Sequence, residues 1–483
     1  MSSQFQRNLT IGIFWSIFGR IGYLLVALAT NIILVRFLTP YEFGQVGIVI
    51  FFISIAQVLI DTGLSGALIR KKEILEIDYS TVFLFNLGVS LILMLLLIGF
   101  AGQIAQYYDD LSLKNILVVS SSLLLINAFR LTQTAKLIHQ LEFRKKASYE
   151  FASVLVASII AIIMAWQDFG VWAVIALQVL TAFLLTAIMW FFEGAIKSFR
   201  FSKTSFLSLY KFGINTTFAS LLITAFDNIY QLILAKYFAI SQTGLFYQSK
   251  KIQDVPLGLI SMLANGVLFS SLAKIQDDRK KFNLLYNRIT TAFSALMGFA
   301  CAAIVLYAEQ IINLLYGNQW IDASFYLQIL IVVAFFYMHE ILTQTIFKTF
   351  DKTQKILYLE LVKKIIQTIS IIIGVVLLNL KILLLGFLIT YVFSYTINMI
   401  YARREINASV LEELARTIKI VLTASIAMIF TELVLDYFSV QGYYSFLALP
   451  MLFLIYFMFL RVTKVFSLIE DIKAIKQVIT EKK

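Results

Sequence analysis

Residues 80–101 read STVFLFNLGVSLILMLLLIGFA, a run of 22 residues without a charged side chain. A helix that crosses the hydrocarbon core of a bilayer needs about 20 consecutive, mostly apolar residues. The run follows the basic cluster Arg70, Lys71 and Lys72, and such clusters stay on the cytoplasmic side of a membrane. The stretch therefore predicts a membrane-spanning helix that begins near the cytoplasm.

Similar apolar runs continue along the whole chain of 483 residues, of which 60% are apolar and whose mean hydropathy is +0.86. Fourteen runs are long enough to span a bilayer, which predicts an all-α integral membrane protein with fourteen transmembrane helices. Such a composition excludes a soluble globular domain. The longest predicted external connection covers residues 309–323 only, so any function must be performed by the helices themselves.

The distribution of charge predicts the orientation. Of the 40 lysines and arginines, the odd-numbered connections carry only Arg36, Lys114, Lys236 and Lys381. Most of the others lie in the even-numbered connections and in the termini, so both termini are predicted to be cytoplasmic in a multi-pass protein of the inner (plasma) membrane. The net charge of +12 then reflects loops that face anionic membrane lipids, and no nucleic acid partner is expected.

Short repeats indicate an internal duplication. The matching segments are LVRFL at 34–38 with LAKYF at 234–238, Gly44 with Gly244, TQT at 132–134 with TQT at 343–345, and Glu150 with Glu360. The members of each pair are six predicted spans apart, so the two copies have the same orientation. This predicts two parallel six-helix lobes, a plan known from transporters.

The repeat also sets the predicted domain limits. We expect an N-terminal six-helix lobe, an interfacial linker rich in aromatic and basic residues, a C-terminal six-helix lobe, two additional transmembrane helices and an amphipathic tail on the inner leaflet. These segments cover, in order, residues 1–195, 196–212, 213–402, 403–462 and 463–483.

Several segments resemble one family of membrane proteins. The segments are LVRFLTPYEFG at 34–44, DTGLSGALI at 61–69, FGVWA at 169–173, TGLFY at 243–247 and YGNQW at 316–320. Together with the fourteen spans, they are similar to the Wzx-type polysaccharide flippases of the multidrug/oligosaccharidyl-lipid/polysaccharide exporter superfamily. The likeness is strongest to the lipopolysaccharide and teichuronic acid exporters.

The resemblance implies export of a lipid-linked oligosaccharide, carried on undecaprenyl pyrophosphate, to the outer leaflet by alternating access. Polysaccharide-assembly proteins are the possible partners, besides membrane lipids. One alternative is a cation-coupled multidrug antiporter of the same superfamily. A membrane glycosyltransferase or polymerase is a further alternative, which the short external connections disfavour. The flippase reading makes the chain a transporter and not an enzyme.

Basic residues within the predicted spans are the candidate substrate-binding residues. Arg20 and Arg130 lie deep in spans 1 and 4, and a guanidinium group can donate two parallel hydrogen bonds to a phosphate. Lys250 and Lys251 begin span 8 and are also candidates for binding phosphate. Each arginine could instead pair with a buried carboxylate and join helices, and each lysine could extend its ammonium group to the membrane surface.

Carboxylates within the spans are the candidate ion-coupling residues. Asp227 is followed by Asn228 in span 7, and Asp61 lies near the end of span 2. An intramembrane carboxylate can carry a coupling proton or sodium ion, or balance an arginine. Glu360 is expected to favour a helix N-terminus, and Lys363 and Lys364 are expected to reach the cytoplasmic surface.

No cofactor is expected. The two histidines, His139 and His339, have no metal-ligand partner at helical spacing, and the sequence contains no P-loop for nucleotide binding. Cys301 is the sole cysteine, which excludes an intrachain disulfide. The aromatic residues near the predicted external ends form an interfacial belt, and a few of them could stack on sugars.

Overall fold

The computed structural model describes residues 3–61, 63–71, 74–194, 199–440 and 442–466. Within these ranges, the side chains of residues 3–18, 20, 70, 211–216, 219 and 267 are not described. The predicted amphipathic tail lies outside the described residues, except for residues 463–466. Part of the predicted linker, residues 196–198, also lies outside them.

The described residues form helices, and none of them forms a strand. The α-helices are α1 (Ser3–Phe37), α2 (Pro40–Asp61), α3 (Leu64–Arg70), α4 (Glu76–Tyr107), α5 (Ser112–His139), α6 (Phe143–Trp166), α7 (Val171–Glu193), α8 (Lys203–Tyr237), α9 (Ile240–Leu263), α10 (Phe269–Ala273), α11 (Arg279–Leu306), α12 (Ala308–Tyr316), α13 (Ala323–Thr349), α14 (Thr353–Val376), α15 (Leu380–Glu405), α16 (Val410–Tyr437) and α17 (Leu449–Val462). A π-helical segment, η1 (Ala264–Leu268), joins α9 to α10, and short 3₁₀ helices occur at η2 (Asn318–Trp320) and η3 (Gly442–Ala448).

The boundaries of several helices follow from local chemistry. Ser202 and Asp278 precede α8 and α11, and their side chains accept hydrogen bonds from backbone N–H groups of the first turn. Such caps satisfy donors that have no partner within the helix. Asp168 and Asn407 each lie just after a helix and have a positive φ angle. Short polar residues tolerate this conformation better than most others do.

The all-α prediction is confirmed, and the chain is a multi-pass membrane protein. Eleven helical segments of the described chain are long and apolar enough to cross a membrane. The expected spans 13–35, 213–235 and 356–378 are not among the eleven, although they lie within α1, α8 and α14. Some side chains of α1 and α8 are not described. Every eighteen-residue stretch of α14 includes three charged residues, Glu360, Lys363 and Lys364.

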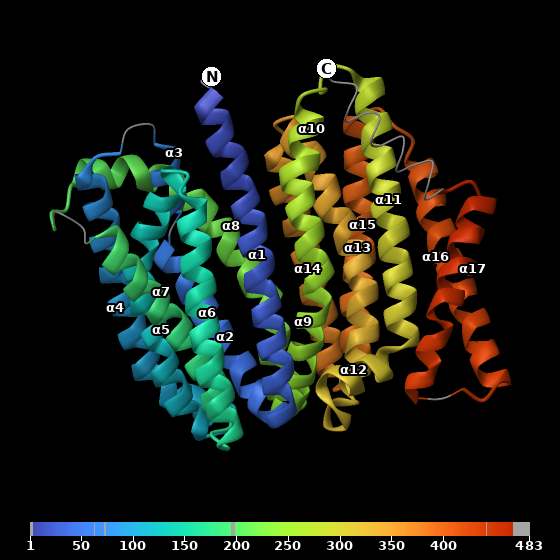
Figure 1. Cartoon of the computed structure of the whole chain (residues 1–483), viewed down its shortest axis with the longest axis horizontal. Helices are drawn as coiled ribbons and strands as arrows, with labels where there is room; N and C mark the ends of the chain where they lie inside the picture. The colour runs from blue at the N-terminus through green and yellow to red at the C-terminus, as the bar shows by residue number, and fades with distance from the viewer. Residues whose placement is uncertain (1–2, 62, 72–73, 195–198, 441, 467–483) are drawn as a thin grey trace. The chain divides into compact units, whose positions relative to one another are not determined.

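The chain divides by packing after Tyr247, within α9, into two compact units. In unit 1, α4 packs against α5, α6 packs against both α1 and α7, and α8 packs against α2 and α3. In unit 2, α15 packs against α13 and α14. Helix α11 packs against α13 and α16, and α17 packs against α16 (Figure 1). This packing boundary does not coincide with the predicted linker at 196–212. Helix α8 begins at Lys203, within that predicted linker. The two-lobe layout stays a prediction.

The two glycines of the sequence repeat meet in unit 1, where the first turns of α2 and α9 cross. A Cβ atom added to Gly44 would lie 1.9 Å from the carbonyl oxygen of Ile240, and one added to Gly244 would lie 1.8 Å from that of Pro40. Only glycine allows two backbones to approach so closely. The contact is reciprocal, because residues 40 and 44 correspond to residues 240 and 244 in the repeat. We call it the glycine crossing.

Candidate functional site

Arg130 lies where three helices of unit 1 come together. It is half-buried on α5, where the carboxylate of Glu150 on α6 attracts its charge and Tyr23 of α1 is part of its surroundings. Glu150 also accepts a hydrogen bond of 2.6 Å from Lys146. Glu150 is thus the nearby anion for Arg130, while the direct ion pair of Glu150 is with Lys146.

Arg20 lies on α1, one turn before Tyr23, and its side chain is outside the described part of the molecule. The neighbouring Gly19 fixes the approach of α1 to α6, because an added Cβ atom there would lie 2.3 Å from the Cβ atom of Ala147. The structure thus brings the helix of Arg20 to the same group of helices as Arg130. It does not define the direction of the Arg20 side chain.

The candidate coupling residues of unit 1 lie on two helices. Asp227 is half-buried on α8. The side-chain amide of Asn228 donates to the carbonyl oxygen of Thr224 at 2.9 Å, and its oxygen accepts from Gln231 at 3.3 Å. Asp61 is the last residue of α2, and its buried Oδ1 atom accepts no hydrogen bond from the described residues. The structure does not bring Asp61 into the polar group formed by Asn228 and Gln231.

Lys250 and Lys251 lie in the part of α9 that belongs to unit 2, and both are half-buried. Lys251 is attracted electrostatically by Asp254, one turn further along the same helix. Lys251 thus has an acidic neighbour within its own helix, as Arg130 has Glu150 on a neighbouring helix.

A buried ion cluster in unit 2 was missed by the sequence analysis. Its centre is the pair formed by Glu340 of α13 and Lys363 of α14, whose side chains are 2% and 3% exposed. The ammonium nitrogen lies 2.9 and 3.0 Å from the two carboxylate oxygens of Glu340. The hydroxyl group of Ser394 on α15 donates to the same carboxylate at 2.9 Å. The cluster therefore joins three helices.

Two further charges on α14 complete the cluster. The carboxylate of Glu360 lies 3.7 Å from the ammonium group of Lys363 and 3.8 Å from that of Lys364. The rings of Tyr337 and Tyr391 approach Lys363, with centroids 5.0 and 4.4 Å from its nitrogen. Two carboxylates and two ammonium groups give no net charge, which is the condition for keeping charges out of water.

The expectation that Lys363 and Lys364 reach the membrane surface is wrong, because both side chains are buried against carboxylates. The spacing of residues 360, 363 and 364 does indicate that they share one face of a helix. The partner on α13 could not be inferred, since it depends on how the two helices are rotated and aligned.

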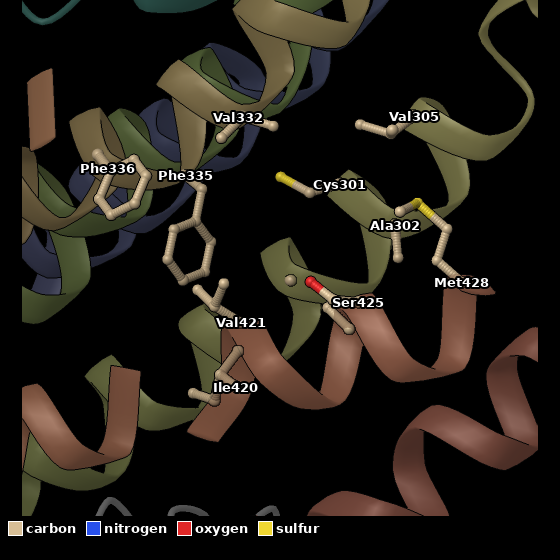
Figure 2. A pocket seen from close by; sticks show the side chains of 12 residues that line it. Cys301, Ala302, Val305, Val332, Phe335, Phe336, Ile420, Val421, Ser425 and Met428 are labelled. Carbon is tan, nitrogen blue, oxygen red and sulfur yellow. The ribbon is translucent and has the colours of Figure 1, made fainter. Parts of the chain in front are cut away.

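An apolar pocket of ≈ 160 Å³ lies between α11, α13 and α16. Figure 2 shows Cys301, Phe335 and Met428 around this space, with Ser425 as a polar neighbour. No charged residue lines the pocket. It can therefore accept hydrocarbon groups, and it offers no cation for a phosphate and few polar groups for a sugar.

The model of a family described as "Polysaccharide biosynthesis protein" matches residues 33–325. The chain belongs to this family. Among similar proteins, the succinoglycan biosynthesis transport protein ExoT of Rhizobium meliloti is 24% identical over 318 residues, which are 65% of this chain and 64% of that protein. The lipopolysaccharide biosynthesis protein WzxC of Escherichia coli is 22% identical over 66% of this chain and 65% of its own length. The alignments thus reach less than two thirds of either relative.

The family member also shares its fold with solved transporters. The structure titled "Lipid II flippase MurJ, inward closed conformation" superposes with a TM-score of 0.71 and 17% identity, covering 94% of this chain and 98% of that one. An inward-facing multidrug resistance MATE transporter of the MOP superfamily has a TM-score of 0.62 and 15% identity, covering 80% of this chain and 94% of its own. At these identities the likeness establishes the fold only.

Proposed function

We propose that the protein is a flippase that moves a lipid-linked oligosaccharide from the cytoplasmic to the outer leaflet of the inner (plasma) membrane. The observation that carries this proposal is a fold shared with the Lipid II flippase MurJ over 94% of the chain, in a member of a polysaccharide biosynthesis family. Relatives named for succinoglycan transport and lipopolysaccharide biosynthesis support a cargo built from sugars. Both termini are cytoplasmic in this proposal.

The cargo we propose is linked to undecaprenyl pyrophosphate and crosses by alternating access. Its hydrocarbon tail can remain in the bilayer, while its pyrophosphate must cross a layer in which an unpaired charge is costly. Arg20 and Arg130 supply the cations, each able to donate two hydrogen bonds to phosphate. In this proposal Glu150, which attracts Arg130 electrostatically, balances it when cargo is absent. Binding of the pyrophosphate replaces one anionic partner by another, so Arg130 is never left unpaired.

The test is export of a fluorescent lipid-linked oligosaccharide in proteoliposomes. Arg130→Ala and Arg20→Ala should abolish flipping while the protein still inserts, and Arg130→Lys should restore it only in part, because a point charge lacks the planar fork. Arg404→Ala is the matched control, since Arg404 is exposed at the end of α15. Wild-type rates in both alanine variants would refute these roles.

We further propose that an ion gradient drives the flippase through Asp227, with Asn228 beside it as a polar ligand. In the same liposomes, Asp227→Asn should remove the response to an imposed proton or sodium gradient and leave cargo binding intact. An unchanged response would make Asp227 a structural residue.

A second candidate function is that of a cation-coupled drug antiporter, which the fold shared with the MATE transporter supports. Gradient-driven uptake of a cationic dye, without flipping of the oligosaccharide lipid, would favour that activity over ours.

A further inference from the structure

A polar cavity of ≈ 440 Å³ lies beside α12 in unit 2. Figure 1 shows α12 at the end of this unit that lies opposite α10. Its walls come from the end of α11, from α12, from the last turns of α16 and from η3. These elements adjoin the connections 309–323 and 437–442, which the charge distribution assigns to the external side. The volume is typical of a site for a small molecule. We call this cavity the acidic vestibule.

The charged residues that line the acidic vestibule are all acidic. They are Glu309 of α12 and Glu432 and Asp436 of α16, and no lysine, arginine or histidine lines the cavity. A phosphate group would therefore be repelled, whereas hydroxyl and ammonium groups would find acceptors. In the part of the chain that the structure describes, no three carboxylate, histidine or cysteine side chains are grouped so as to hold a metal ion.

A second observation comes from Tyr307, which also lines the vestibule. Its side chain is only 1% exposed, and its ring packs against Phe446 with centroids 5.2 Å apart. Its hydroxyl group is buried and has no hydrogen-bond partner among the described residues. The Oε1 atom of Gln310, in the same wall, is likewise unpartnered. Buried polar groups are normally hydrogen-bonded, and a hydroxyl-bearing molecule in the cavity would give both atoms a partner.

We propose that the acidic vestibule binds a sugar residue without negative charge, presented by the oligosaccharide of the cargo at the external side. A sugar offers neighbouring hydroxyl donors to the carboxylates, and Tyr307 and Gln310 complete its hydrogen bonds. Tyr443 at the rim supplies an aromatic face for the C–H groups of the ring. The inference rests on the proposed function and adds to it the class of sugar and the place where the sugar is held on the external side.

The experiment is saturation-transfer NMR on the purified full chain in nanodiscs, with D-glucose, D-galactose, N-acetyl-D-glucosamine and D-glucosamine as separate probes. At least one probe should bind to the wild type. Tyr307→Phe keeps the ring packing and removes only the hydroxyl group, and Asp436→Asn removes one charge. Each should weaken binding roughly tenfold, the loss expected when a hydrogen bond that involves a charged or buried group is removed. Glu412→Gln, at the opposite end of α16, is the matched control and should bind as the wild type does.

Absence of binding by the wild type for all four probes would overturn the proposal, as would equal binding by the wild type and both vestibule variants. Thermal unfolding of each variant shows whether it is folded. Flipping of the lipid-linked oligosaccharide by wild-type protein that binds no probe would leave the proposed function standing without the vestibule. Binding of a probe by protein that does not flip the lipid-linked oligosaccharide would support the vestibule as a sugar site and count against the proposed function.

Discussion

Replacing Lys363 by methionine should destabilise the protein strongly. The change removes the ammonium group that lies 2.9 and 3.0 Å from the carboxylate oxygens of Glu340. Among the described residues, the hydroxyl group of Ser394 then remains as a hydrogen-bond donor to this carboxylate. Breaking a buried ion pair in this way typically costs about 3–5 kcal/mol, because one charge stays buried without compensation. The protein can escape part of that cost by protonating a carboxylate. For a carboxyl group of ordinary acidity, protonation at pH 7 costs about 3.7 kcal/mol. We therefore expect a loss of about 3–4 kcal/mol at pH 7.

The double variant Glu340→Gln/Lys363→Met separates charge from packing. It leaves the cluster neutral, because Glu360 still faces Lys364 at 3.8 Å. Replacing both partners of a buried pair is often close to neutral, so the double variant should recover most of the lost stability. Lys355→Met on the same helix is the control. Lys355 pairs with Glu405 at 2.5 Å but is 37% exposed, and such pairs contribute about 1 kcal/mol or less.

The assay is denaturant unfolding of the purified protein in detergent, followed by tryptophan fluorescence at pH 7 and at pH 5. Because protonation is easier at lower pH, the deficit of Lys363→Met relative to the wild type should shrink at pH 5. A single variant as stable as the wild type would refute the reasoning, and so would a double variant that is no more stable than the single one.

Three further predictions concern other parts of the chain. On a Cys301→Ala background, a membrane-impermeant thiol reagent added to intact cells should label Lys381→Cys and not Lys145→Cys; the reverse pattern would contradict the proposed topology. Gly44→Ala should destabilise the protein by about 1–3 kcal/mol, the usual cost of overpacking, because its Cβ atom would lie 1.9 Å from the carbonyl oxygen of Ile240. Gly99→Ala is the control and should change stability little, because a Cβ atom added at Gly99 would have no atom of another segment within 4 Å. For Asp110, burial alone would raise the pKa, but hydrogen bonds from Ser112 and Gln45 outweigh burial and lower the pKa. The stabilisation from this lowered pKa is complete above the unfolded value of about 3.9 and is lost as the pH falls through the folded value. The difference in melting temperature between the wild type and Asp110→Asn should accordingly be largest near neutral pH and vanish in acid, and a constant difference would count against the ionised Asp110.

The sequence predicted the helical membrane architecture well, because the length of an apolar run alone decides whether a helix can cross a bilayer. The length of an apolar run does not predict how far a helix extends beyond the membrane into its polar flanking residues. Ser202 caps α8, so this helix begins at Lys203, ten residues before the predicted span.

The candidate site was harder to predict. Position within a span singled out Arg130 as a candidate, and the structure places it half-buried with Glu150 of α6 as a nearby anion. Its role in binding stays a prediction. The pairing of Glu340 with Lys363 was missed, because it depends on the packing of α13, α14 and α15, and a single chain carries no local sign of that packing. The unpartnered hydroxyl group of Tyr307 is equally a tertiary property.

The glycine crossing has the form of an interface between two identical subunits. In a two-fold dimer a patch on one subunit meets the same patch on the other, so that each residue occurs twice in the contact. Gly44 meets the carbonyl oxygen of Ile240 as Gly244 meets that of Pro40, and the two sets are 200 residues apart along one chain. A single ancestral gene for a six-helix subunit that paired with itself in parallel would have built this contact from one glycine. In such a history, duplication and fusion of the gene would let the surrounding residues diverge, while each glycine would keep its contact with the backbone of the other copy.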